Sequence, residues 1–89
     1  MKSKFPTVWA RIEVLQGQSF TQPRGDEFTY EVRSGCVAPA RTNRLIPRGQ
    51  FKKAWEMVPL ERAGPVQSLQ GPSYIYAILM DSRVSAGEW

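Results

Sequence analysis

The feature that most restricts the fold of this 89-residue chain is a run of seven apolar residues, Tyr74 to Met80. A membrane-spanning helix takes about 18 or more such residues, so this run is too short to cross a bilayer. We expect it to fill the core of a globular domain instead. Pro72 and Ser73, which precede the run, favour a helix over 73–81, whereas its Tyr-Ile-Tyr sequence leaves a buried strand open.

A second apolar pattern predicts an amphipathic helix in the middle of the chain. Its apolar residues recur at the spacing i, i+3, i+4 and i+7, which places them on one side of a helix. They are Phe51, Ala54, Trp55 and Val58. Pro47 suits the first turn of this helix and Pro59 ends it, which leaves a helix of about ten residues with Trp55 in the core.

Alternating apolar and polar residues predict β-strands in the first half of the chain. Residues 8–15 alternate in this way, and so do residues 28–32. A period of two over such lengths is typical of a half-buried strand.

Turn-forming residues connect these strands to shorter ones. The segment 22–27 contains Pro, Gly and Asp, and it joins residues 28–32 to a short strand around Phe20. Ser34-Gly35 predicts a tight turn into a return strand over 36–38. The predicted fold class is therefore α+β: an N-terminal antiparallel β-meander of three to four strands packed against a central amphipathic helix and a C-terminal apolar helix.

The length predicts one small domain over 1–89, with flexible ends at 1–7 and 82–89 unless Trp89 packs against the core. The first residues contain no apolar run of signal-peptide length, so a cytoplasmic location is expected. Cys36 is the single cysteine and there is no histidine. A disulfide framework within the chain and a Cys/His zinc site are thus excluded.

Catalytic chemistry has little support in the sequence. Without histidine, the chain lacks the usual general base near neutral pH. No nucleophile elbow, P-loop or dinucleotide-binding glycine motif is present. Asp26 and Glu27 are adjacent acids, but they lie in the predicted turn and are expected to be solvated. We therefore expect no enzymatic activity, no catalytic residue, no metal and no cofactor.

Positive charge is concentrated in one segment. The net charge is +4, and residues 32–55 hold six of the 12 lysines and arginines and none of the acids. The remainder holds six cations against eight acids, a net charge of −2. Such an asymmetry suggests an anionic partner, most commonly a nucleic acid.

The sequence thus predicts a small non-enzymatic nucleic-acid-binding module, with DNA and RNA both open. Arginine offers a planar fork to phosphate oxygens and lysine a point charge. Thr42 and Asn43 add short hydrogen-bonding groups for phosphates or base edges. The cations predicted to contact the phosphate backbone are Arg41, Arg44, Arg48, Lys52 and Lys53.

Other interpretations remain open at this level. The main alternative is a small protein-interaction or inhibitor protein that docks onto an acidic protein surface, with Trp9 or Trp89 as an apolar anchor. Trp9 falls on the polar side of its predicted strand, where it is either exposed or covers the second side of a thin sheet. A solvated cationic surface without a specific partner is a further alternative. A homodimer through a strand edge or the run Tyr74–Met80 is also open.

Overall fold

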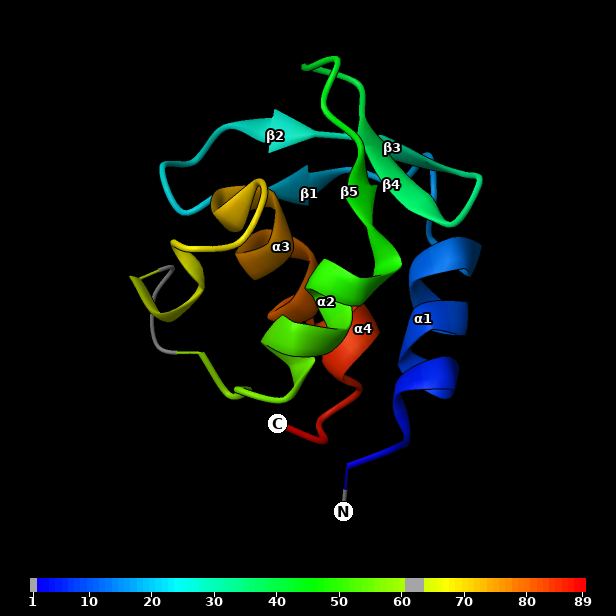
Figure 1. Ribbon diagram of the computed structural model, residues 1–89, viewed down its shortest axis with the longest axis vertical. Helices are drawn as coiled ribbons and strands as arrows, with labels where there is room; N and C mark the ends of the chain where they lie inside the picture. The colour runs from blue at the N-terminus through cyan, green and yellow to red at the C-terminus, as the bar shows by residue number, and fades with distance from the viewer. Residues whose placement is uncertain (1, 61–63) are drawn as a thin grey trace.

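The computed structural model describes residues 2–60 and 64–89, and these residues confirm the α+β class. Figure 1 shows two small antiparallel sheets along the top of the view, with the helices beneath them and both termini at the bottom. The helices are α1 (Phe5–Val14), α2 (Arg48–Trp55), α3 (Pro72–Leu79) and α4 (Ser82–Ser85), with a 3₁₀ turn, η1, at Gly64–Val66. The strands are β1 (Phe20–Thr21), β2 (Glu27–Phe28), β3 (Tyr30–Arg33), β4 (Cys36–Pro39) and β5 (Ile46–Pro47). No helix within the described ranges is long and apolar enough to cross a membrane.

The strand predicted over 8–15 is wrong, because this segment belongs to helix α1. Ala10 and Val14, which the strand would have buried, are exposed, Val14 to 80%. The buried side of α1 follows the helical spacing i, i+3, i+4 and i+7. It consists of Phe5, Val8, Trp9 and Ile12.

Two periods coincide in this segment, because residues four positions apart share a side in both a helix and a strand. Val8 and Ile12 therefore fit either structure, whereas Phe5 and Trp9 fit only the helix. Pro6 lies in the first turn, where its missing N–H costs no hydrogen bond. Trp9 is only 7% exposed, so the interpretation that required an exposed Trp9 is also wrong.

The predicted turn at Ser34-Gly35 is confirmed. These two residues join β3 to β4 and have φ angles of 51° and 75°. Positive φ at both positions gives the turn a twist that matches the flanking strands. Strand β4 then pairs with β5, with Val37 opposite Ile46, which completes a sheet in the order β3-β4-β5.

The strand predicted over 28–32 is interrupted at Thr29, so its residues divide between β2 and β3. The predicted sides are nonetheless correct, since Phe28 and Tyr30 are buried. Phe28 pairs with Phe20 across the β1–β2 turn. The Tyr30 hydroxyl donates a hydrogen bond to the carbonyl oxygen of Ile12 at 2.6 Å, which joins the sheet to α1, and burial raises the pKa of Tyr30.

The two predicted helices in the second half are confirmed. Helix α2 starts directly after Pro47 and has eight residues, slightly fewer than expected. Phe51 is fully buried, but Trp55 is only half-buried, so the core position predicted for Trp55 is correct in part. Helix α3 spans Pro72–Leu79, which favours the helical alternative for the apolar run.

The ranges 1–7 and 82–89, for which flexible ends are predicted, include described residues that pack against the domain, such as Phe5 and Val84. Trp89 does pack against the core, and its Nε1 donates a hydrogen bond to the carbonyl oxygen of Leu79 at 2.9 Å. Helix α4 occupies part of the C-terminal segment and buries Val84.

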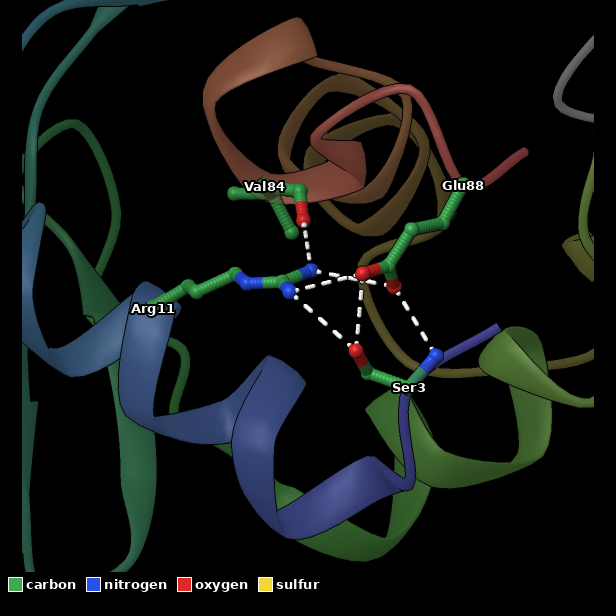
Figure 2. Close-up of polar contacts among 4 residues, drawn as sticks. All are labelled: Ser3, Arg11, Val84 and Glu88. Carbon is green, nitrogen blue, oxygen red and sulfur yellow. Dashed lines mark hydrogen bonds and ion pairs between the residues drawn. The ribbon is translucent and has the colours of Figure 1, made fainter. Parts of the chain in front are cut away.

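A charged network holds the two ends together (Figure 2). Arg11 of α1 donates hydrogen bonds to the Val84 carbonyl oxygen at 3.0 Å and to Glu88 Oε2 at 2.9 Å. The backbone N–H and the hydroxyl of Ser3 donate to the same carboxylate at 2.9 and 2.7 Å. The Glu88 carboxylate thus connects the segment before α1 to the C-terminal residues.

This network predicts a pH-dependent stability. Hydrogen bonds from Arg11, and then from Ser3, lower the pKa of Glu88 to about 2 in the folded protein. An unfolded Glu titrates at about 4.3, so the stabilisation is complete above that pH and is lost as the pH falls towards the folded pKa. Glu88→Gln should therefore lower the melting temperature near neutral pH, and its difference from wild type should shrink below about pH 4.

Thermal melts followed by circular dichroism across that pH range would test this expectation. Glu13→Gln is the matched control, because Glu13 is an exposed acid on α1 for which no ion pair is found among the described residues. A difference between Glu88→Gln and wild type that stays constant with pH would contradict the role given to the carboxylate.

The unequal burial of two aromatic residues on α2 gives a second expectation. Phe51→Ala should lower the free energy of unfolding by about 3–5 kcal/mol, because Phe51 is fully buried and its removal leaves a cavity beside Trp9. Trp55→Ala should cost clearly less, since part of its ring is already solvated. Urea unfolding followed by circular dichroism gives the free energy of unfolding of both variants. A decrease for Trp55→Ala that equals or exceeds the decrease for Phe51→Ala would contradict this expectation.

Candidate nucleic-acid interface

The cations predicted to bind phosphate lie on two consecutive elements of the fold. The β4–β5 loop, residues 40–45, carries two of them and helix α2 carries three. Figure 1 shows this loop projecting at one end of the molecule, with β5 leading from it down to α2. All five side chains are exposed. We call them the basic strip, which consists of Arg41, Arg44, Arg48, Lys52 and Lys53.

The base of the loop is fastened to the neighbouring strands. The N–H of Ala40 donates a hydrogen bond to the carbonyl oxygen of Thr29 at 2.9 Å. Arg41 Nη1 donates a longer one to the carbonyl oxygen of Glu27 at 3.4 Å. Arg41 therefore leans back over β2, and its other N–H groups point to no acceptor identified in the described part of the chain.

Thr42 shapes the loop. Its hydroxyl oxygen accepts a hydrogen bond from the backbone N–H of Arg44 at 3.2 Å, which closes a local turn. Thr42 thus has a structural task that the sequence analysis did not assign, and its O–H remains as a donor for a ligand. Asn43, between these two residues, is exposed and offers both the donor and the acceptor of its amide.

Helix geometry sets the directions of the three cations on α2. Residues four positions apart lie on the same side of a helix, so Arg48 and Lys52 project together, and Lys53 lies about 100° further round. The Arg48 guanidinium lies over the rings of Phe5 and Trp9, with distances of 5.1 and 5.9 Å to the ring centroids. The Arg48 side of α2 therefore faces α1.

The start of α2 is only partly open to a ligand, because the Arg48 N–H already donates a hydrogen bond to the carbonyl oxygen of Gly35 at 3.0 Å. No side chain caps this end of the helix, where Pro47 precedes the first turn. Nothing lies within 4 Å of the position that a Cβ of Gly49 would occupy, so the backbone there is accessible. The N-terminus of a helix favours an anion through its dipole and its amide groups. These features add to the charge of the basic strip.

Within residues 2–60 and 64–89, no carboxylate forms an ion pair with the basic strip. The ion pairs found there are Arg11–Glu88, Arg33–Glu31 and Arg83–Asp81. Arg33, the sixth cation of residues 32–55, is thus paired with an exposed acid at 3.3 Å and does not join the strip. Glu56, one turn beyond Lys52, is exposed and makes no such pair in the described part.

No group of three metal-ligating acids or cysteines that could hold a metal ion is found in the described part of the chain. Asp26 and Glu27 are both exposed at the β1–β2 turn, as the sequence predicted. Glu27 accepts a hydrogen bond from the Ser19 hydroxyl at 3.2 Å. Cys36 is a half-buried free thiol beside the β3–β4 turn.

Two residues near the basic strip were not selected from the sequence. Leu45 is 50% exposed at the end of the β4–β5 loop, because its neighbour Ile46 on the alternate side fills the core. Lys2 donates a hydrogen bond to the Trp55 carbonyl oxygen at 3.1 Å, and its Nζ lies 4.3 Å from the Trp55 ring centroid. Strand alternation could have indicated Leu45, whereas only the packing of the fold brings Lys2 to α2.

Comparison of the chain with protein-family models, with curated proteins and with solved structures gave no match. The function must therefore be inferred from the geometry and charge of the site.

The exposure of the basic strip predicts that most of its cations are dispensable for folding. Arg44→Gln and Lys52→Gln should each change the free energy of unfolding by less than about 0.5 kcal/mol. Arg48→Gln should cost about 0.5–1 kcal/mol, because it removes the cation–π contacts with Phe5 and Trp9. Thermal melts of the three variants compare these losses directly. A large loss for Arg44→Gln or Lys52→Gln would make that side chain structural and remove it from the candidate site.

Proposed function

We propose that this protein is a small non-enzymatic nucleic-acid-binding module that holds a phosphate backbone with its basic strip. The observation that carries the proposal is the absence of carboxylate partners for five exposed cations in the described part of the chain. Arg11 and Arg83, elsewhere on the fold, are paired with acids.

Unpaired cations favour phosphates for a physical reason. A nucleic acid carries condensed counterions, and each cation that neutralises a phosphate releases them into solution. A cation that already pairs with a carboxylate would have to give up that partner first. No carboxylate of residues 2–60 and 64–89 imposes this cost on the strip, so no ion pair in that part of the chain has to be broken for such an exchange.

The two parts of the strip differ in what they offer. Arg41 and Arg44 lie on the projecting loop, where the guanidinium fork can meet two oxygens of one phosphate. Lys52 and Lys53 offer point charges on the last turn of α2. Both parts belong to one continuous piece of chain joined by β5.

The alternative, a protein that docks on an acidic protein surface, is weakened because neither of its tryptophan anchors is fully exposed. Trp9 was one of its two apolar anchors, and it is buried between α1 and α2. Trp89, the other anchor, is half-buried and uses its N–H on Leu79. The same basic strip would still serve such a partner, so this alternative becomes an outcome of the binding experiment.

The proposal predicts binding that weakens with salt. If the five cations meet phosphates of a duplex, the logarithm of the association constant should fall against the logarithm of salt concentration with a slope of about −4 to −5. Fluorescence anisotropy with labelled duplex DNA, single-stranded DNA and RNA measures this slope. Failure to bind any of the three at low salt would exclude the proposal and favour a protein partner.

The site assignment has its own test. The double variant Arg44→Glu/Lys52→Glu should make the slope shallower by roughly 2, because two phosphate contacts are lost. Arg24→Glu is the matched control, since Arg24 is exposed, unpaired among the described residues and lies on the β1–β2 turn outside the basic strip. The double variant changes the net charge twice as much as the control, so a control effect of half the size would mean that net charge, rather than the strip, governs binding.

A further inference from the structure

The β4–β5 loop combines three kinds of exposed side chain, whereas the basic strip itself consists of cations alone. Arg41 and Arg44 are exposed cations, Asn43 is an exposed amide, and Leu45 is an exposed apolar side chain. Helix α2 adds only cations and Gly49 to its exposed surface. The loop projects at one end of the molecule, while α2 lies nearer the middle (Figure 1).

The aromatic residues favour a duplex over a single strand. Proteins that hold single strands usually stack successive bases on exposed aromatic rings. All the aromatic residues of this chain lie in its described part, and each is buried or half-buried there. The rings that pack in the core are not available as stacking platforms. A ligand is therefore more easily held through its backbone and grooves.

The major and minor grooves of DNA differ in the size of the protein element that can enter them. The major groove takes a whole helix, whereas the minor groove is about 6 Å wide and takes individual side chains. Arginine is attracted to the strong negative potential of narrow A·T-rich minor grooves. Asparagine reads the edges there, and an apolar side chain such as leucine can wedge between base steps. The loop supplies each of these groups.

We infer that the β4–β5 loop enters the minor groove of duplex DNA, while the α2 cations hold the flanking phosphates. The inference rests on the proposed function and adds its ligand: an A·T-rich DNA duplex, read by Arg44 and Asn43 with Leu45 at a base step. RNA duplexes fit this loop less well, because their minor groove is wide and shallow.

Competition and sequence preference test the inference on the intact chain. Two labelled duplexes of equal length, one of A·T and one of G·C pairs, are compared by anisotropy at the same salt concentration. The A·T duplex should bind about fivefold to tenfold tighter, because its narrow groove attracts arginine. Netropsin, a small molecule that occupies A·T minor grooves, should displace the protein.

Paired variants test the part played by the loop. Leu45→Ser should weaken binding to the A·T duplex roughly tenfold through loss of the wedge, with little change in the salt slope. Val14→Ser is the matched control, since Val14 is an exposed apolar residue on α1, and it should leave binding unchanged.

The outcomes separate the two proposals. Salt-dependent duplex binding without A·T preference or netropsin competition would overturn the minor-groove inference and leave the proposed function intact. Equal losses for Leu45→Ser and Val14→Ser, or tighter binding to an RNA duplex, would also overturn it. Failure to bind any nucleic acid would remove both proposals together.

Discussion

The aromatic contact between α1 and α2 is the interaction on which the rest of the structure depends. Phe5 packs against Trp55 with ring centroids 5.7 Å apart, and Trp9 packs against Phe51 at 5.9 Å. Such tilted pairs add about 0.5–1.5 kcal/mol each to the area that they bury. They also fix the rotation of α2 about its own axis. Once Phe51 faces the core, helical geometry directs the two lysines that follow it, Lys52 and Lys53, towards solvent.

The distribution of charge follows from this arrangement. The acids of the C-terminal segment are engaged by arginines, Glu88 by Arg11 of α1 and Asp81 by Arg83, whereas the basic strip keeps its charges unpaired within the described residues. Arg48 and Lys52, one turn apart, repel each other by about 0.2–0.5 kcal/mol. The contacts of Arg48 with the rings of α1 offset that repulsion. A surface needed only for solubility would interleave charges of both signs, and it is the lack of carboxylate partners among the described residues that motivates the proposed ligand.

The sequence predicted α2, α3 and the β3–β4 turn, because their signals are local. Pro47 directly precedes α2, and Ser34-Gly35 alone specifies a hairpin turn. The first helix was missed because Val8 and Ile12 satisfy two periods, and only the burial of Phe5 and Trp9 distinguishes the helix from a strand. The Arg11–Glu88 contact joins residues 77 positions apart, so no local pattern could indicate it. The cations of the candidate site stand out in the charge distribution alone and strand alternation could have indicated Leu45, whereas the turn closed by Thr42 is visible only in the folded chain.

In the proposed function, two tasks that many nucleic-acid-binding surfaces combine fall to different residues. Phosphate contacts position a protein on a duplex without reading its sequence, and contacts in the grooves supply any preference. The exposed side chains of α2 are cations, so under this proposal they would contribute affinity that salt weakens. The exposed amide and the exposed apolar side chain next to the strip lie on the β4–β5 loop. Because the loop is fastened at its base to Thr29 and Glu27, it can present these groups without first losing much conformational entropy. Affinity and preference are therefore expected to depend on different residues of one short piece of chain.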